Sequence, residues 1–462
     1  MPVAGENIIR TNSLILPRTG LAAAGFAALV IPLLLVAPAI WNGYPLLQWD
    51  TGGYLARWYE GYLVPSRSTV FGFYLHIGQS SYFWINLGAQ AFATLWVMLI
   101  ALNGFGIARP WKIAAMASAL CLTTSLPWLT SILLTDIYAG LATLAVMLLT
   151  LQGARLAMTE KIFLWSLIAF SVASHNATLV MLIGLCLLGA MARPFLRARI
   201  SGKGLWQSVA CMAAGAAMLL ASNYWFSGTL AWTPGGPSIA FGRMMQDGIV
   251  ARYLDDHCAT EKLKLCPHRH ELPATADQFL WGKSVFNSLG RFRGLGDEMA
   301  YIAWRSLIEY PGMQVKTSLL STAKQLTMVA TGDGVHNGIG HTYGIFERYL
   351  RGQLIPLRAA HQQQGRIDFT IINKFHIPIA LGSALLLVGI VGAALWRKKA
   401  DDLSLFAAAA AAAIFGNAFI CGALSGPHDR YGARMAWLAT FIALIAVVRW
   451  MNWHDDKSAA TA

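Results

Sequence analysis

The apolar stretch LAAAGFAALVIPLLLVAPAI at residues 21–40 is followed by a polar segment, WDTGGY, at residues 49–54. About 20 apolar residues cross the hydrocarbon core of a bilayer as a helix, so residues 21–40 predict a membrane span. Asp50 comes ten residues after that stretch. An ionisable side chain at the membrane boundary is costly and is a candidate for function by default. The rest of the chain is therefore searched for more spans and for side chains that could join Asp50.

The whole chain has the composition of a membrane protein. Of its 462 residues, 56% are hydrophobic and 12% are charged, whereas soluble domains carry about 25% charged residues. The formal net charge of +13 comes largely from clusters between apolar stretches, as in cytoplasmic loops, so no nucleic-acid partner is expected. The clusters are Arg109 and Lys112; Arg155 and Lys161; Arg193, Arg197, Arg199 and Lys203; and Arg397, Lys398 and Lys399.

Hydropathy predicts an all-α polytopic protein with about ten transmembrane helices. The stretches lie near 21–40, 83–103, 113–133, 136–152, 162–174, 177–192, 205–224, 376–396, 402–421 and 435–450. With the N-terminus inside, counting the crossings places every basic cluster and both termini in the cytoplasm of a bacterial inner membrane. No small-residue cleavage site ends the first stretch, so we expect it to stay as a helix.

The pair 162–192 is too short for two full tilted spans and turns at Ser174-His175-Asn176. Either it enters from the cytoplasm as a hairpin, or two short helices meet at a protein-lined site. Polar backbone at membrane depth needs protein or a water-filled cavity around it, so both alternatives place His175 in a cavity.

The chain divides into three predicted parts. Residues 1–224 are a membrane module with catalytic outer loops, residues 225–375 are a mainly helical periplasmic domain, and residues 376–462 contain the last three helices and a short tail. In the periplasmic part, Cys258 and Cys266 are expected to form a disulfide. A metal cluster with the nearby His257, His268 and His270 is the less favoured alternative, because the spacing matches no tight tetrahedral motif.

Two carboxylates are predicted to lie at outer helix ends. Asp50 and Asp136 could converge in one cavity, where one acts as general base toward an acceptor hydroxyl and the other orients the acceptor or holds a divalent metal. Simpler alternatives remain: Asp136 as a helix N-cap, and Asp50 as a turn residue before Gly52-Gly53.

Arginines are depleted from outer loops, yet two predicted outer loops contain them. The first carries Arg57 and Arg67, and the second contains Gly426-Pro427-His428-Asp429-Arg430-Tyr431-Gly432-Ala433-Arg434. The guanidinium fork matches phosphate geometry, so a shared lipid-linked phosphate is the favoured ligand. The alternatives are ordinary phospholipid headgroups or pairing with Glu60 and Asp429.

These residues resemble the GT-C superfamily of membrane glycosyltransferases, which includes the protein O-mannosyltransferases and lipid A aminoarabinose transferases. The likeness is carried by Asp50, Tyr54, Pro65, Arg67 and Phe71-Gly72-Phe73-Tyr74 in the first outer loop, by Asp136, and by Arg430-Tyr431 before a late helix. It spans most of the membrane part and none of residues 225–374. The family's paired acidic motif is missing, because Trp49 and Thr51 flank Asp50.

The resemblance implies inverting transfer of a sugar from a polyprenyl-phosphate donor to a glycan, lipid or protein acceptor on the periplasmic face. Asp50 would be the base and Asp136 would place acceptor or metal. Donor and acceptor would be bound by Arg67, Tyr54, His175, His428, Arg430, Tyr431 and Arg434. The sequence requires no cofactor, and a divalent metal stays open.

Three other functions compete with this hypothesis. A transporter or flippase of a lipid-linked or anionic substrate would use the same arginines, but no internal repeat supports it. An acyl- or phosphoethanolamine-type transferase would need a nucleophile or metal cluster, for which Asp333, His336 and His341 are candidates. Their glycine-rich surroundings instead predict a flexible loop. An assembly protein without chemistry is the third.

Overall fold

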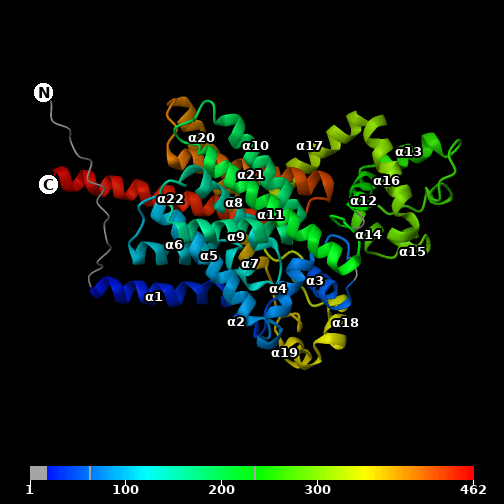
Figure 1. Ribbon diagram of the computed structural model, residues 1–462, viewed down its shortest axis with the longest axis horizontal. Coiled ribbons are helices and arrows are strands. Elements are labelled where there is room, and N and C mark those ends of the chain that lie inside the picture. The colour runs from blue at the N-terminus through cyan, green and yellow to red at the C-terminus, as the bar shows by residue number, and fades with distance from the viewer. Residues whose placement is uncertain (1–17, 62–63, 234–235, 462) are drawn as a thin grey trace.

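The computed structural model describes residues 18–61, 64–233 and 236–461, and in these ranges the chain forms helices joined by loops (Figure 1). A helix lies at each predicted apolar stretch. These helices are α1 (Arg18–Leu35), α5 (Trp84–Gly104), α6 (Pro110–Thr123), α8 (Asp136–Leu151), α9 (Met158–Ser174), α10 (Asn176–Ala192), α11 (Gly202–Ser227), α20 (Thr370–Trp396), α21 (Asp402–Leu424) and α22 (Asp429–Thr461).

Five of the described helices are long and apolar enough to cross a membrane: α5, α11, α20, α21 and residues Asp429–Asn452 of α22. The apolar helices α8 and α10 are shorter. The chain is therefore a multi-pass membrane protein. The expected number of about ten crossings and the sides of the membrane stay predictions.

Prolines divide two of the expected spans. α6 ends at Thr123, Thr124 is extended, and Pro127 lies in the first turn of α7 (Leu126–Ser131). Proline has no N–H and its ring clashes with the preceding helical turn, so 113–133 is not one helix. Similarly, α1 ends at Leu35, and Pro38 lies in the first turn of α2 (Ala37–Asn42).

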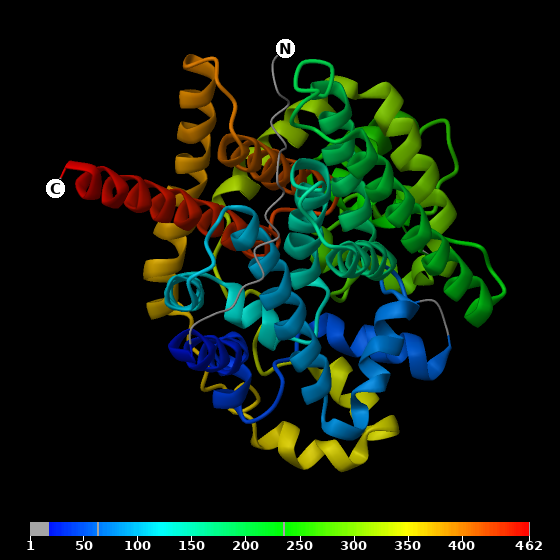
Figure 2. The same cartoon turned by 60° about the vertical axis from the view of Figure 1, so that its left-hand side comes forward.

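The first predicted outer loop is largely helical. It contains α3 (Trp49–Glu60), α4 (Thr69–Ile77) and the short η1 (Gln79–Ser81). Two later helices, α18 (Gly340–Tyr349) and α19 (Leu354–Ala359), lie near this segment (Figure 2), and α18 packs directly against α3. Buried Ile345 and Phe346 of α18 belong to the main hydrophobic core.

Residues 236–310 form a lobe with its own hydrophobic core, which we call the α12–α16 lobe. Its helices are α12 (Gly236–Gln246), α13 (Ile249–His257), η2 (Cys266–His268), α14 (Ala276–Leu280), α15 (Val285–Ser288) and α16 (Arg291–Glu309). Its buried residues, such as Phe241, Tyr253 and Phe286, form a cluster separate from the main core. Cys258 and Cys266 form a disulfide in it, the alternative that the sequence favoured.

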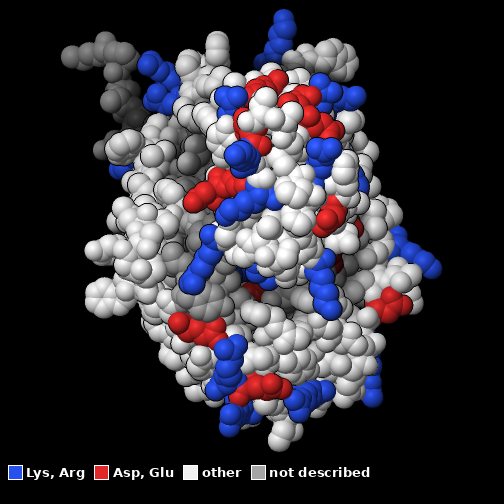
Figure 3. All heavy atoms as spheres, turned by 90° about the vertical axis from the view of Figure 1, so that its right-hand side faces the viewer, with Lys and Arg blue, Asp and Glu red and all other residues white. Residues whose placement is uncertain are grey.

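The α12–α16 lobe lies at the end of the molecule opposite to the start of α1 and the end of α22 (Figure 1). α17 (Pro311–Thr327) connects it to the long helices and packs along α21. At the end of the molecule formed by the α12–α16 lobe, Lys and Arg side chains are interspersed with Asp and Glu (Figure 3). Some of these side chains form ion pairs, such as Arg252 with Asp256. This surface therefore has no single sign of charge.

α9 and α10 have 17 residues each, because α9 begins at Met158, before the expected start at 162. They meet at His175, whose backbone is extended. The helix pair is thus longer than the hydropathy pattern indicated. Whether it forms a hairpin or two spans stays a prediction.

Candidate functional site

An isolated parallel bridge between Leu46 and Ile132 aligns the two segments that carry the candidate carboxylates. The backbone N–H of Leu46 donates to the Ser131 carbonyl at 2.9 Å, and that of Leu133 donates to the Leu46 carbonyl at 3.0 Å. Asp50 and Asp136 each follow their bridge residue by four positions. The end of α7 at Ser131 therefore has a structural use: the extended Ile132 that follows it pairs with residue 46.

Both carboxylates lie in the first turn of a helix, Asp50 in α3 and Asp136 in α8. A helix N-terminus carries partial positive charge and stabilises an anionic side chain. Gln48 caps α3: its side chain accepts from the Asp50 N–H at 3.1 Å, and its own N–H donates to Thr51 Oγ1 at 3.0 Å. Asp136 is not the N-cap of α8, because Thr135 holds that position.

Gly52 and Gly53 lie inside α3 and are not part of a turn. A Cβ atom on Gly52 would lie 2.6 Å from Thr342 Oγ1, and one on Gly53 would lie 3.2 Å from Arg67 Cγ. The glycine pair therefore allows α18 and the Arg67 side chain to lie against the first turns of α3, next to Asp50.

Arg430, in the first turn of α22, bridges the two carboxylates. Its Nη1 donates to Asp50 Oδ2 at 2.7 Å and its Nε donates to Asp136 Oδ2 at 2.6 Å. A cation is unfavourable at a helix N-terminus, so the two carboxylates compensate for its position. One guanidinium group thereby connects the starts of three helices, α3, α8 and α22.

Arg434, one turn further along α22, is 1% exposed. Its Nη1 lies 3.5 Å from Asp136 Oδ1, its Nε and Nη2 donate to Asn417 Oδ1 at 3.0 and 2.6 Å, and Nη2 also contacts the sulfur of Cys421. Such a buried charge is tolerated only with partners on most of its donors. Arg434 is thus an internal support of the site, held by α21.

Asp50 also forms an ion pair with Arg67, the residue before the Ser68 N-cap of α4. Burial opposes ionisation of Asp50, but the guanidinium groups of Arg67 and Arg430 outweigh it and lower its pKa to about 2. Asp50 is therefore a carboxylate at neutral pH. Asp50, Asp136, Arg67, Arg430 and Arg434 together are called the ionic cluster below.

The structure places the other predicted site residues around this cluster. Tyr54 is buried, its hydroxyl lies 3.3 Å from Thr135 Oγ1, and the Arg67 guanidinium lies over its ring. The guanidinium carbons of Arg430 and Arg434 lie 5.8 and 5.3 Å from the Tyr431 ring centre.

The two predicted histidines have different neighbours. His175 is half-buried, bonds to Thr178 Oγ1 at 3.2 Å, and is close enough to interact electrostatically with Asp50 and Asp136. The Nε2 atom of His428 lies 3.3 Å from Asp277 of the α12–α16 lobe. His428 therefore links the lobe to the loop before α22.

Arg57 and Glu60 have partners in the structure that differ from those expected from the sequence. Arg57 is buried away from the cluster, where it donates to Thr69 Oγ1 at 2.9 Å and Asn223 Oδ1 at 2.5 Å. Glu60 pairs instead with Arg348, at 2.6 Å. Arg57 thus fastens α3 to α4 and α11, and the phosphate ligand that we expected it to share would have to be bound by the other arginines.

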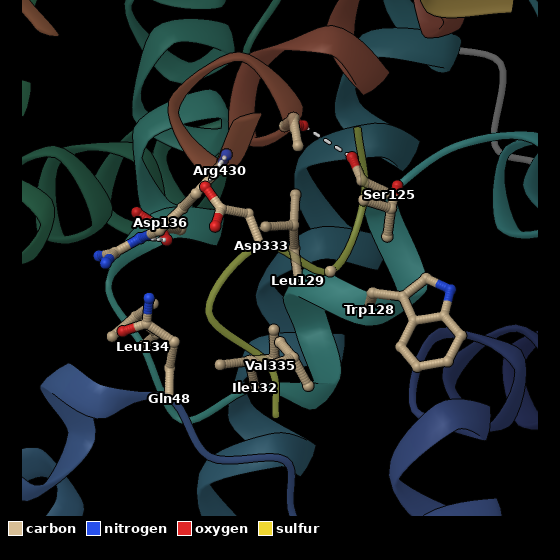
Figure 4. A pocket seen from close by; sticks show the side chains of 13 residues that line it. Gln48, Ser125, Trp128, Leu129, Ile132, Leu134, Asp136, Asp333, Val335 and Arg430 are labelled. Atoms are coloured by element: carbon tan, nitrogen blue, oxygen red, sulfur yellow. Dashed lines mark hydrogen bonds and ion pairs between the residues drawn. The ribbon is translucent and has the colours of Figure 1, made fainter. Parts of the chain in front are cut away.

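A recess of about 340 Å³, including space open to solvent, adjoins the cluster. Figure 4 shows Asp136, Asp333 and Arg430 near one another in this recess, with the apolar residues Leu129, Val335 and Trp128 elsewhere in its lining. It therefore offers both a charged and an apolar wall.

Asp333 lines the recess, although the sequence offers it only for the competing acyl- or phosphoethanolamine-type transferase. Its Oδ2 accepts from the Arg430 backbone N–H at 3.1 Å. The surrounding glycines were interpreted as a flexible loop, but Gly332 and Gly334 have φ of +99° and +78° and form a tight turn that is packed on the recess. An acidic residue between such glycines was the available signal.

The residues present do not fit a divalent metal at the cluster. Both carboxylate oxygens of Asp50 are already engaged by guanidinium groups, as is Oδ2 of Asp136. Within the described ranges there is no group of three or more His, Cys, Asp or Glu side chains with a metal-binding arrangement. His336 instead contacts the Trp49 indole.

No known protein family, curated protein or solved structure matches this chain.

Proposed function

We propose that the protein is an inverting glycosyltransferase of the GT-C type, which moves a sugar from a polyprenyl-phosphate donor to an acceptor on the periplasmic face of the inner membrane. The observation that carries the proposal is the bridge that Arg430 makes between Asp50 and Asp136 beside a recess with a charged and an apolar wall. In the charged wall, Arg430 would contact the donor phosphate. The apolar wall suits the hydrocarbon of its lipid carrier.

The charge of the cluster matches such a donor. Within the ionic cluster, which does not include Asp333, three guanidinium groups and two carboxylates leave one net positive charge. A sugar phosphodiester of a lipid carries one negative charge. During transfer the acceptor hydroxyl loses its proton to Asp50, its oxygen attacks the anomeric carbon, and the bond from that carbon to the phosphate oxygen breaks. The electron pair stays on the phosphate, next to the arginines, which is where preorganised charge has its largest effect.

The low pKa of Asp50 fits this scheme only if donor binding raises it. In the free protein Arg67 and Arg430 lower the pKa of this carboxyl to about 2, too low for an effective base at neutral pH. A donor phosphate would share the same two guanidinium groups and add a negative charge nearby. Both changes favour protonation of Asp50, so the base would become effective only when the donor is bound.

Asp136 and Arg434 have supporting parts in this proposal. Asp136 is 3% exposed and bonded to Arg430 on one oxygen. It would hold Arg430 in position for the phosphate, and Arg434 would hold Asp136. Tyr54 and His175 lie beside the cluster and would contact the sugar or the acceptor.

The test compares Asp50→Asn with Asp402→Asn. Asp402 is also bridged by two arginines, Arg155 at 3.0 Å and Arg199 at 3.1 Å, and its side chain is as buried as that of Asp50. It lies at the other end of α21, about 28 Å along the helix from Cys421. Each variant thus removes one carboxylate that is bridged by two arginines, so Asp402→Asn is a matched control for Asp50→Asn.

The measurement is mass spectrometry of envelope glycolipids and glycans from cells that make each variant or lack the protein. We expect a sugar increment that is lost without the protein and with Asp50→Asn, by a factor of about 100 or more, and kept with Asp402→Asn. Normal product with Asp50→Asn would refute the base assignment. Transport of a lipid-linked substrate into liposomes with no new glycosidic bond would indicate a flippase.

A further inference from the structure

A second recess lies between α12, α17 and the loop that joins α21 to α22. It has about 440 Å³ of empty space, including space open to solvent, and it is separate from the ionic cluster. Its wall contains Arg243 and Asp247 near the end of α12, Leu320 and Lys324 of α17, and Pro427 of the loop. Nothing in the proposed transfer reaction uses these residues.

Arg243 has one buried nitrogen without a partner. The residue is 5% exposed; its Nε donates to Asp247 Oδ2 at 3.1 Å, and its Nη2 donates to Asp247 Oδ1 and to Ser321 Oγ. Its Nη1 is buried and forms no hydrogen bond with any residue that the structure describes. A charged donor left without an acceptor is costly, so an oxygen acceptor placed in the recess would be favoured.

The loop between α21 and α22 lies close to Nη1. A Cβ atom on Gly426 would lie 3.8 Å from it, and Gly426 has a φ of +139°. Gly426 therefore lies close to this nitrogen, and its backbone conformation disfavours any larger residue there.

The charge and surface of the recess indicate what binds. Asp247 offsets Arg243, and the exposed Lys324 adds one positive charge, with no ion pair among the side chains that the structure describes. Leu320 is 61% exposed, and Val315 and Leu319 on the same helix are each 59% exposed. A positive recess next to exposed apolar side chains suits an amphiphile with an anionic headgroup.

We propose that this second recess binds the phosphate group of an amphiphile, with Arg243 Nη1 and Lys324 Nζ as its donors. The hydrocarbon lies along the exposed apolar side chains of α17. The site is separate from the donor site, and the proposal does not depend on glycosyl transfer. A free phosphate has the same headgroup chemistry, so the experiment distinguishes the two sources.

The test measures the thermal unfolding midpoint of the full chain in detergent during titration with three probes. These are inorganic phosphate, short-chain phosphatidic acid and the uncharged diacylglycerol with the same chains. We expect saturable stabilisation by phosphatidic acid and none by diacylglycerol. Stabilisation by inorganic phosphate at equal concentration would assign the site to a free anion and overturn the lipid source.

Lys324→Gln is the deciding variant, because Lys324 is exposed and its replacement leaves the fold intact. Loss of one charge-assisted contact should weaken phosphatidic acid binding by about tenfold. Lys316→Gln is the matched control, since it removes the same charge from an exposed position of the same helix outside the recess. Equal effects of the two variants would refute the proposal.

A second variant, Arg243→Gln combined with Asp247→Asn, removes the donor and keeps the charge balance of the buried pair. We expect it to abolish the stabilisation by phosphatidic acid. Unchanged binding in this folded double variant would also refute the assignment. Neither variant alters the ionic cluster, so failure here leaves the glycosyltransferase proposal untouched.

Discussion

Arg430 donates from Nε to Oδ2 of Asp136 at 2.6 Å, although 294 positions separate the two residues in the chain. The contact fastens the first turn of α22 to the first turn of α8. The same guanidinium group reaches Asp50, so a segment close to the C-terminus completes a site whose carboxylates lie in the first third of the sequence.

The bridge predicts that Arg430→Gln weakens binding of the donor lipid far more than binding of the acceptor. Loss of one charge-assisted contact should raise the Kd for polyprenyl phosphate by about 10- to 100-fold. Titration of the purified protein with polyprenyl phosphate in nanodiscs would measure this. An equal loss of affinity for donor and acceptor would contradict a phosphate role for Arg430.

Arg434 predicts an effect on stability. Arg434→Met leaves Asp136 with one arginine fewer and leaves Asn417 without its charged partner, so we expect about 3 kcal/mol of destabilisation. Arg449→Met is the control, because Arg449 is partly exposed and lies 3.8 Å from Asp401, where an ion pair contributes less than about 1 kcal/mol. The free energy of unfolding of the two variants would be measured in mixed micelles. Similar losses of stability in both would argue against a buried network around Arg434.

The disulfide predicts a local effect. Replacing Cys258 and Cys266 by serine removes a crosslink that restricts the unfolded chain. We expect the free energy of unfolding to fall by about 2–3 kcal/mol. Because the α12–α16 lobe has its own core, protease cleavage should become faster between residues 236 and 310 and stay unchanged in the long helices. Uniformly faster cleavage would show that the lobe does not unfold by itself.

His428 predicts a pH dependence of stability. Its hydrogen bond to Asp277 raises the pKa of His428 above its ordinary value, and Asp333 and Arg430 also face it. A raised pKa means that the contribution is complete below about pH 6.5 and is lost as the pH rises through the higher folded-state value. As the pH rises above about 6.5, the unfolding midpoint should therefore fall more steeply in the wild type than in His428→Gln. Parallel curves would refute the link.

Much of the helical pattern follows from local sequence. The expected span 402–421 corresponds to α21, whose start is fixed by the Asp401 side chain, which accepts from the Ser404 N–H at 2.9 Å. Apolar stretches of this length specify helices because the bilayer leaves no other way to satisfy the backbone. The divisions at Pro38 and Pro127 were also visible in the sequence, but hydropathy averaging conceals such short interruptions.

The site was harder to predict, because its contacts join distant segments. Charge type and position brought Asp50, Asp136 and three arginines into one hypothesis. Which carboxylate each arginine contacts depends on the bridge between Leu46 and Ile132, and this pairing leaves no local pattern. Arg57 shows that charge and loop position alone do not identify a site residue. It has the same charge and the same predicted loop as Arg67, yet it is buried and donates to Asn223.

The contacts of α21 bear on how the protein can move. At one end Asp402 is paired with Arg155 and Arg199, and near the other end Asn417 and Cys421 hold Arg434 of α22. Sliding α21 by one helical turn, about 5.4 Å, would separate both sets of partners at once. Contacts at both ends of α21 therefore oppose a sliding motion of this helix against its neighbours.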